Sequence, residues 1–285
     1  MVIQYLDSLV NVIDKENIKV WGIDSESHFV DIMAVQILLK KYFDEFPFPM
    51  EWNRLHESYR KKFINFRNDD AISPSIEEDI ELMECIDSIS NYVDYIVYQK
   101  GNNMDLKVIK QWIRNLNTQF SYAEEYDPKD IKKTTFTFRN RDYQMAENII
   151  FITENMPEER LFVWCANFHA TKDLSQTAHP TVPLLYYRYQ SMGETLLNHY
   201  GEKMYSIGFA DYSNKKEDSL EAEIKNRTKN NEEYAFIDFE RLRFEDGYRN
   251  KTFKTSLFAD KGKWLNIFDG YYYLEKQEKI ILSYE

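Results

Sequence analysis

The sequence predicts an α/β protein with a mainly parallel sheet, flanking helices and an inserted helical hairpin subdomain. Short apolar runs that end in polar residues, at Ile18–Asp24 and Leu161–Cys165, are typical of buried parallel strands. Helical periodicity precedes and follows the first run, at about Met1–Ile13 and Phe29–Phe43. The middle of the chain instead carries apolar residues at alternating spacings of four and three, which is typical of helices that pack along a seam.

The region from about 49 to 135 is the predicted helical insertion. Ser73 and Pro74, followed by acidic residues, mark a helix start. Two apolar seams follow, separated by Gly101 and two asparagines; they consist of Leu82, Ile86, Ile89, Val93 and Ile96, and of Ile109, Ile113, Leu116 and Phe120. Two such helices joined by a glycine turn form a hairpin. The hairpin is compatible with a lid or with a surface that forms a homo-oligomer.

After the insertion, the chain is predicted to return to a sheet, so that residues 1–285 form a single domain. The expected elements are a helix at Met192–Tyr200 and strands at Met204–Phe209, Tyr234–Phe239, Phe253–Phe258 and Gly270–Leu274. The strands at Ile18–Ile23, Leu161–Cys165 and Met204–Ile207 are expected to be neighbours. The charged segment Lys215–Glu233 is predicted to be a mobile surface excursion.

Composition excludes several classes of protein. The eight glycines lie at least seven residues apart, which excludes the glycine-rich phosphate loops and the G-x-S-x-G elbow of many serine hydrolases. A net charge of -12 without a basic run argues against a nucleic-acid partner. Two cysteines form neither a zinc pattern nor a disulfide framework, and no apolar segment is long enough to span a membrane. We therefore expect a cytoplasmic protein without a metal, a cofactor or a membrane partner.

Candidate site residues follow from the rule that ligands bind at the carboxyl ends of parallel strands. Asp24 ends the first predicted strand, and Asn167 and His169 follow Leu161–Cys165. In a helix predicted from Arg139, two more polar residues, Arg141 and Asn148, share a face with Met145 and Ile152. We expect Asp24, Arg141, Asn148 and His169 to converge on one cleft.

Each candidate also has a structural interpretation. His169 could be a satisfied loop residue, and Asp24 could cap the helix that follows it. Arg141 could form a salt bridge, for instance with Asp142 or Asp24. Cys165 lies inside an apolar run, which favours a buried, inert thiol over a nucleophile.

Several motifs together resemble the erythromycin esterase family. They are Arg141-Asp142-x-x-Met145-Ala146-x-Asn148, Val163-Trp164-x-x-Asn167-x-His169, Met192-Gly193-x-x-Leu196 and Ile207-Gly208-Phe209, with weaker markers at Gly22-x-Asp24 and Phe268-Asp269. They occur in the family's order. The resemblance implies an erythromycin esterase-like fold and hydrolysis of an ester or macrolide lactone by histidine-activated water, with a link to antibiotic resistance. It assigns His169 and Arg141 to catalysis, and Asp24, Asn148 and Asn167 to a small-molecule substrate.

Two departures from the family pattern leave two interpretations. Ala166 stands where the family has the first histidine of His-Asn-x-His, and the N-terminal G-E-x-x-H segment, whose histidine is regarded as the general base, has no counterpart. The chain thus resembles the C-terminal two-thirds of a member and is expected to be incomplete at its N-terminus. It is either a hydrolase or a truncated, non-catalytic relative that keeps the scaffold and a weak ligand pocket. A missing general base costs about 10² to 10⁴ in rate, which predicts slow or absent hydrolysis.

Overall fold

The computed structural model describes most of the chain in separate stretches. These are residues 29–42, 45–46, 52–55, 57, 76–125, 131–157, 160–178, 189–211, 219–227, 234–245, 248, 250–255 and 261–274. The predictions for Met1–Ile13 and Ile18–Asp24 lie outside the described residues, as does the second half of the strand predicted at Phe253–Phe258.

The predicted helical hairpin is confirmed as α4 (Ile76–Lys100) and α5 (Met104–Glu125). Gly101 adopts a φ of 82°, the left-handed conformation that ends α4, and Asn103 caps α5 by accepting a hydrogen bond from the Leu106 amide at 3.1 Å. The seam residues that the structure describes are almost completely buried: Leu82, Ile86, Ile89, Val93, Ile96, Ile109, Ile113 and Leu116. Apolar spacing, together with the turn at Gly101, therefore predicts this part of the fold.

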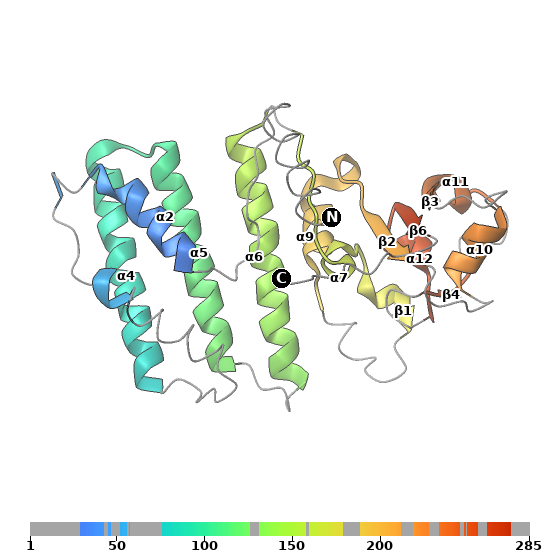
Figure 1. The fold of residues 1–285 in the computed structure, drawn as a ribbon, viewed down its shortest axis with the longest axis horizontal. Helices are drawn as coiled ribbons and strands as arrows, with labels where there is room; N and C mark the ends of the chain where they lie inside the picture. The colour runs from blue at the N-terminus through green and yellow to red at the C-terminus, as the bar shows by residue number, and fades with distance from the viewer. Residues whose placement is uncertain are drawn as a thin grey trace, which may run out of the picture.

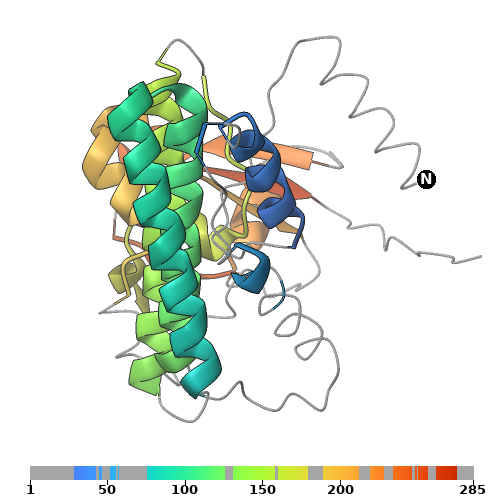
Figure 2. The ribbon, with the colours of Figure 1, turned by 90° about the vertical axis from the view of Figure 1, so that its left-hand side faces the viewer.

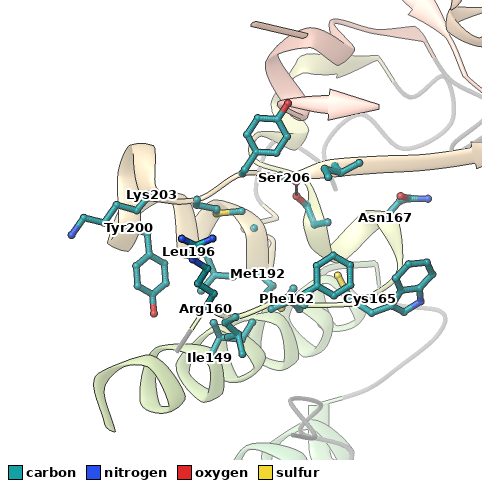
Figure 3. A pocket seen from close by; sticks show the side chains of 18 of the residues that line it. Ile149, Arg160, Phe162, Cys165, Asn167, Met192, Leu196, Tyr200, Lys203 and Ser206 are labelled. Carbon is teal, nitrogen blue, oxygen red and sulfur yellow. Dashed lines mark hydrogen bonds between the residues drawn. The ribbon is translucent and has the colours of Figure 1, made fainter. Parts of the chain in front are cut away.

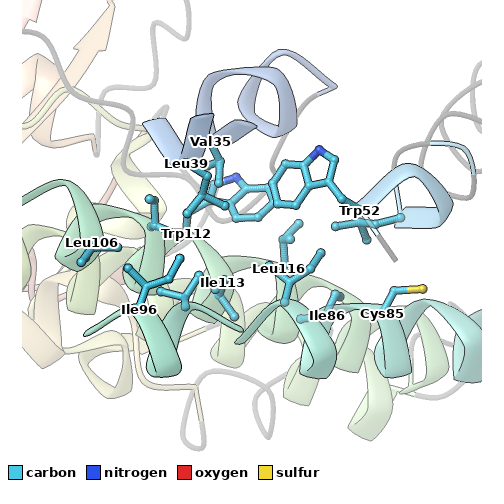
Figure 4. Close-up of a cluster of buried hydrophobic side chains, with 14 of the residues drawn as sticks. Val35, Leu39, Trp52, Cys85, Ile86, Ile96, Leu106, Trp112, Ile113 and Leu116 are labelled. Carbon is cyan, nitrogen blue, oxygen red and sulfur yellow. The ribbon is translucent and has the colours of Figure 1, made fainter. Parts of the chain in front are cut away.

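Helix α2 (Phe29–Lys40) lies across the hairpin and completes its core. Val35 and Leu39 of α2 meet the side chain of Trp112, and the ring of Trp52 lies beside that of Trp112, tilted by 33°, at 6.0 Å between ring centroids (Figure 4). The helix predicted at Phe29–Phe43 is confirmed, although it ends at Lys40. Pairs of large aromatic rings bury much apolar area, which stabilises a helix as short as α2.

Helix α6 (Ile131–Asn155) lies between the hairpin and the C-terminal part of the chain (Figures 1 and 2). One side packs against α5, and on the other side Met145 and Ile149 pack against α9 (Met192–Tyr200). Because α6 begins well before Arg139, Arg141 lies in its third turn and not near its start. The helix is thus buried on two sides, and Met145 contacts a helix where a sheet was expected.

The described strands form two small sheets. In the larger one, β2 (Ile207–Asp211) runs parallel to β6 (Gly270–Leu274), and β3 (Tyr234–Asp238) is antiparallel to β6. The smaller sheet, entirely antiparallel, consists of β1 (Thr177–Ala178), β5 (Lys261–Gly262) and β4 (Phe253–Lys254). The described part of the chain is therefore helix-rich and mixed α/β, and its one parallel strand pair differs from the mainly parallel sheet we expected.

The prediction of a strand at Leu161–Cys165 is wrong. These residues have no regular secondary structure, and Phe162 and Trp164 expose 78% and 74% of their surface. Val163 and Cys165 turn inward against the α6–α9 core. A continuous apolar run predicts a buried strand only if both faces are covered, whereas here the aromatic face is open.

The strand predicted at Met204–Phe209 is found, but shifted to Ile207–Asp211. The backbone N–H of Ser206 donates to the side chain of Asp269 at 2.9 Å, so this group is not available to a strand ladder. Asp269 also pairs with Lys172, and this buried contact fixes the start of β2 beside the start of β6.

The segment Lys215–Glu233 was predicted to be a mobile excursion, and this is wrong for its described part. Residues Leu220–Arg227 form α10, which buries Leu220 and Ile224 on one face. Together with α11 (Phe239–Arg243) and α12 (Trp264–Ile267), it belongs to the core beneath the larger sheet. Ala222 and Glu221 of α10 are also buried, and Glu221 accepts a hydrogen bond from Tyr271 at 2.8 Å, so a short helix in a mostly charged segment is docked by both apolar and polar contacts. Among the described helices, none has the length and hydropathy to cross a membrane.

Candidate functional site: a histidine–aspartate pair beside a cavity

His169 lies in the short helix α7 (Asn167–Ala170), and its imidazole contacts α6. Its Nδ1 is 2.5 Å from Oδ1 of Asp142, whose side chain is completely buried. The His169 side chain keeps 16% of its surface exposed. The sequence rule placed His169 at a strand end, whereas the structure places it at the end of an irregular segment.

The second oxygen of Asp142 binds a backbone amide. Oδ2 accepts a hydrogen bond from the backbone N–H of Met192 at 2.9 Å, at the first residue of α9. A carboxylate that accepts hydrogen bonds on both oxygens is held in one orientation. The carboxylate then accepts from Nδ1–H of His169, which leaves Nε2 as the basic nitrogen. This is the arrangement that orients a general base.

The motif Met192-Gly193 has a steric basis at this site. A Cβ atom on Gly193 would lie 2.4 Å from the backbone oxygen of Thr171, so α9 approaches the residue after α7 as only glycine allows. Ser191 caps α9 by accepting from the Glu194 amide at 3.1 Å and donates to the same Thr171 oxygen at 2.5 Å. These contacts position α9, and with it the Met192 amide, against Asp142.

Asn148, a predicted substrate-binding residue, faces the opposite side of α6. Its Oδ1 accepts hydrogen bonds from Gln111 of α5 at 2.8 Å and from Gln144 at 3.2 Å. All three amides are buried. The structure therefore places Asn148 in the contact between α5 and α6, away from His169, and does not bring these two predicted site residues together.

Asn167, the other amide among the predicted substrate-binding residues, binds the backbone of β2. Its Nδ2 donates to the Phe209 carbonyl at 2.7 Å, and its Oδ1 accepts from the Phe209 amide at 2.8 Å. Arg141 is half-buried next to Asp142 in the sequence, about 100° further round the helix. Asp24, also predicted to bind substrate, lies outside the described residues.

A cavity of about 830 Å³ is lined by sequence neighbours of His169 and by Met192, whose amide binds Asp142, although neither His169 nor Asp142 lines it. Its walls come from residues 160–165, from one face of α9, from residues 203–207 and from the sheet (Figure 3). Asn167 and Ala170, on either side of His169 in α7, line it, and so does Met192. Most of the wall is apolar or aromatic, which is typical of small-molecule sites.

Two residues near the His169–Asp142 pair have raised pKa values. Burial raises the pKa of Cys165 to about 11, with a smaller contribution from the charge of Asp142, so the thiol is not a nucleophile at neutral pH. The pKa of Glu194 is also raised, first by burial and then by Asp173, while Arg139 opposes the shift. Within the described residues, no group of three or more histidine, cysteine or acidic side chains is placed to hold a metal ion.

Asp142 is the site residue that sequence reasoning missed. Asp142 stood in a family motif and as a possible salt-bridge partner for Arg141, without a role in the site, because helical periodicity marks apolar positions and gives no reason to bury an acid. One signal was present: Asp142 precedes Met145 and Ile149 at helical spacings of three and seven, so it shares the face that packs against α9. An acid on an apolar stripe requires a buried partner.

The fold and the site define a mixed α/β protein with a buried carboxylate–imidazole pair beside an apolar cavity. The chain belongs to the erythromycin esterase family, whose sequence pattern it matches over residues 10–256. This confirms the resemblance seen in the motifs.

Two solved structures share the fold. A histidine-to-asparagine mutant of the erythromycin esterase EreC, in its open conformation, is 13% identical with a TM-score of 0.68, covering 98% of this chain and 74% of its own. A Bacillus cereus protein is 17% identical with a TM-score of 0.65, covering 91% of this chain. The match spans 66% of the length of that protein. No curated protein matches the chain.

Proposed function

We propose that the protein hydrolyses a carboxylic ester, with a macrolide lactone as one candidate substrate, by means of water that His169 activates. The observation that carries the proposal is the double hydrogen bonding of the buried Asp142, to His169 Nδ1 and to the Met192 amide. Family membership supports a hydrolase. The match covers 66% of the Bacillus cereus protein, so the activity of this chain is tested directly.

In the proposed reaction, Nε2 of His169 takes a proton from water as the water oxygen attacks the ester carbonyl. The tetrahedral intermediate then expels the alcohol oxygen, which takes the proton back from the imidazolium, and the products are a carboxylic acid and an alcohol. Asp142 holds the imidazole in one tautomer and stabilises its charged form. Arg141 is the cation we assign to the carbonyl oxygen as negative charge develops there.

The test is hydrolysis of an aryl ester and of a macrolide by the purified chain and its variants. His169→Ala is expected to lower the rate by about 10² to 10⁴, the usual contribution of a general base. Asp142→Asn keeps the side-chain shape but is expected to lower the rate and to shift its pH profile, because an amide does not stabilise the imidazolium. Arg141→Ala is expected to lower kcat more than it raises KM.

His199→Ala is the matched control, since His199 is an exposed imidazole near the end of α9. It is expected to leave the rate unchanged. The competing interpretation, a non-catalytic relative, rests on the missing counterpart of the family's G-E-x-x-H histidine. Turnover that is absent, or equal in His169→Ala and the unmodified chain, would favour that interpretation and refute ours.

A further inference from the structure

Among the residues that the structure describes, the charged side chains that line the cavity are both basic: Arg160 and Lys203. The chain as a whole carries 48 acidic and 36 basic residues, so a described lining with two cations and no carboxylate departs from the overall charge balance. A low-dielectric wall strengthens the field of cations at its edge, and such a site concentrates anions.

The two cations and the aromatic walls occupy different parts of the cavity. Arg160 and Lys203 lie at one end, together with Tyr200, while Asn167 lies at the far end (Figure 3). Between them the lining is apolar or aromatic, with Phe162, Trp164, Met192, Leu196 and Met204 among its residues. The volume of about 830 Å³ falls within the range of about 300–1,000 Å³ that is typical of small-molecule sites.

We propose that this cavity binds an amphiphilic anion, a small molecule with an apolar or aromatic body and one carboxylate or phosphate group. The anionic group lies at Arg160 and Lys203, and the body lies along the aromatic wall toward Asn167. This deepens the proposed function, because its consequence for catalysis rests on that function: the favoured esters carry a negative charge, and a macrolide lactone is favoured only where it carries no basic amine. Binding itself does not depend on catalysis.

The occupant follows from charge and shape together. A neutral apolar molecule would use the walls but would gain nothing from the two cations, and an inorganic anion would leave the aromatic wall exposed to water. A molecule that contacts both ends satisfies both. Guanidinium and ammonium groups form strong, charge-assisted hydrogen bonds with carboxylate and phosphate, which fixes the orientation of the ligand.

The experiment compares three probes with the same body and different charge: phenylbutanoate, phenylbutanol and phenylbutylamine. Calorimetric titration of the full chain is expected to give the tightest binding for the anion and the weakest for the amine. One exposed ion pair changes an equilibrium constant by about two- to fivefold, so two cations predict a difference of about 4- to 25-fold between anion and alcohol. Equal affinity for the three probes, or no binding of any, would overturn the proposal.

Substitutions of the lining residues test whether the anion binds at Arg160 and Lys203. Arg160→Gln and Lys203→Gln are each expected to reduce the preference for the anion by about two- to fivefold, and the double variant is expected to abolish it. Lys261→Gln, which removes an exposed cation on β5, is the matched control and is expected to change nothing. Ile207→Trp, at a partly exposed position in the wall, is expected to weaken all three probes by filling the cavity.

The same titration with His169→Ala separates the two proposals. If the chain does not hydrolyse esters but the anion preference persists in His169→Ala, the proposed function fails and the binding site stands. If hydrolysis depends on His169 but Arg160→Gln and Lys203→Gln leave the anion preference intact, the binding site fails and the proposed function stands.

Discussion

The hairpin α4–α5 and the contact between α6 and α9 are both buried, but they are stabilised differently. The hairpin core consists mostly of aliphatic and aromatic side chains, and its seam residues such as Ile86 and Ile89 contact one another without directional bonds. The α6–α9 contact contains a buried acid, Asp142, that bonds an imidazole and a backbone amide. When an apolar core is truncated, the free energy of unfolding falls in proportion to the atoms removed. When a buried charge loses one hydrogen-bond partner, the free energy of unfolding falls steeply, because the charge is no longer compensated. The two regions should therefore respond differently to small substitutions.

The largest expected effect tests the buried acid. Asp142→Ala should lower the free energy of unfolding by about 3–5 kcal/mol, because it leaves the Met192 amide and the His169 imidazole without their partner. Urea unfolding followed by circular dichroism measures the change. Asp142→Asn keeps an oxygen for the Met192 amide and should cost less. A loss below about 1 kcal/mol for the alanine variant would mean that the acid is not a structural requirement.

The hairpin core should show a graded response. Ile89→Ala should cost about 2–5 kcal/mol and Ile89→Val about 0.5–1.5 kcal/mol, because each removed methyl group leaves a void in a close-packed seam. The same denaturant titration measures both. If the valine variant were as unstable as the alanine variant, the seam would require the exact shape of the isoleucine side chain. The hairpin would then respond to substitution in the same all-or-none way that we expect at Asp142.

An intermediate effect is expected at the helix contact that positions the Met192 amide. Gly193→Ala should cost about 1–3 kcal/mol, since its Cβ would meet the Thr171 backbone oxygen at 2.4 Å and the backbone must shift. It should also reduce ester hydrolysis, because α9 carries the amide that holds Asp142. Gly201→Ala, at another glycine near the end of α9, has no steric conflict within 4 Å but has a positive φ of 57°. It should reduce stability without affecting the rate.

The smallest effect concerns Glu194, whose pKa is raised in the folded protein by burial and by Asp173. A raised carboxyl pKa means that ionisation costs stability, so the cost is absent below the unfolded pKa of about 4.3 and grows as pH rises through the folded pKa. Glu194→Gln should therefore raise Tm slightly at pH 7 and leave it unchanged at pH 4. A lower Tm at pH 7 would show that the first-turn carboxylate stabilises α9 instead.

The sequence predicts the parts of the fold that depend on local signals and does not predict the parts that depend on distant contacts. The hairpin and α9 follow from apolar spacing and from the turn at Gly101, which are local signals. The larger sheet depends on pairing between β2 and β6, about sixty residues apart, and no local pattern specifies that pairing or its mixed direction. Leu161–Cys165 was misread because an apolar run does not say whether both of its faces are covered.

The candidate site was predicted in part. His169 was singled out by its place after an apolar run, and the family resemblance added the surrounding motifs. Its partner Asp142 and the orientation of Asn148 depend on which side of α6 meets which neighbour. Because α6 is packed on two sides, helical periodicity alone could not assign those sides.

The side chain of Asn167 has a consequence for how the protein behaves at high concentration. Among the described strands, β2 lies at the edge of its sheet, where a free row of backbone groups would recruit a strand from another molecule. By holding both the amide and the carbonyl of Phe209, the Asn167 side chain occupies the middle of that row. One side-chain amide thus takes the place of a neighbouring strand, and it covers backbone groups through which two copies could otherwise pair.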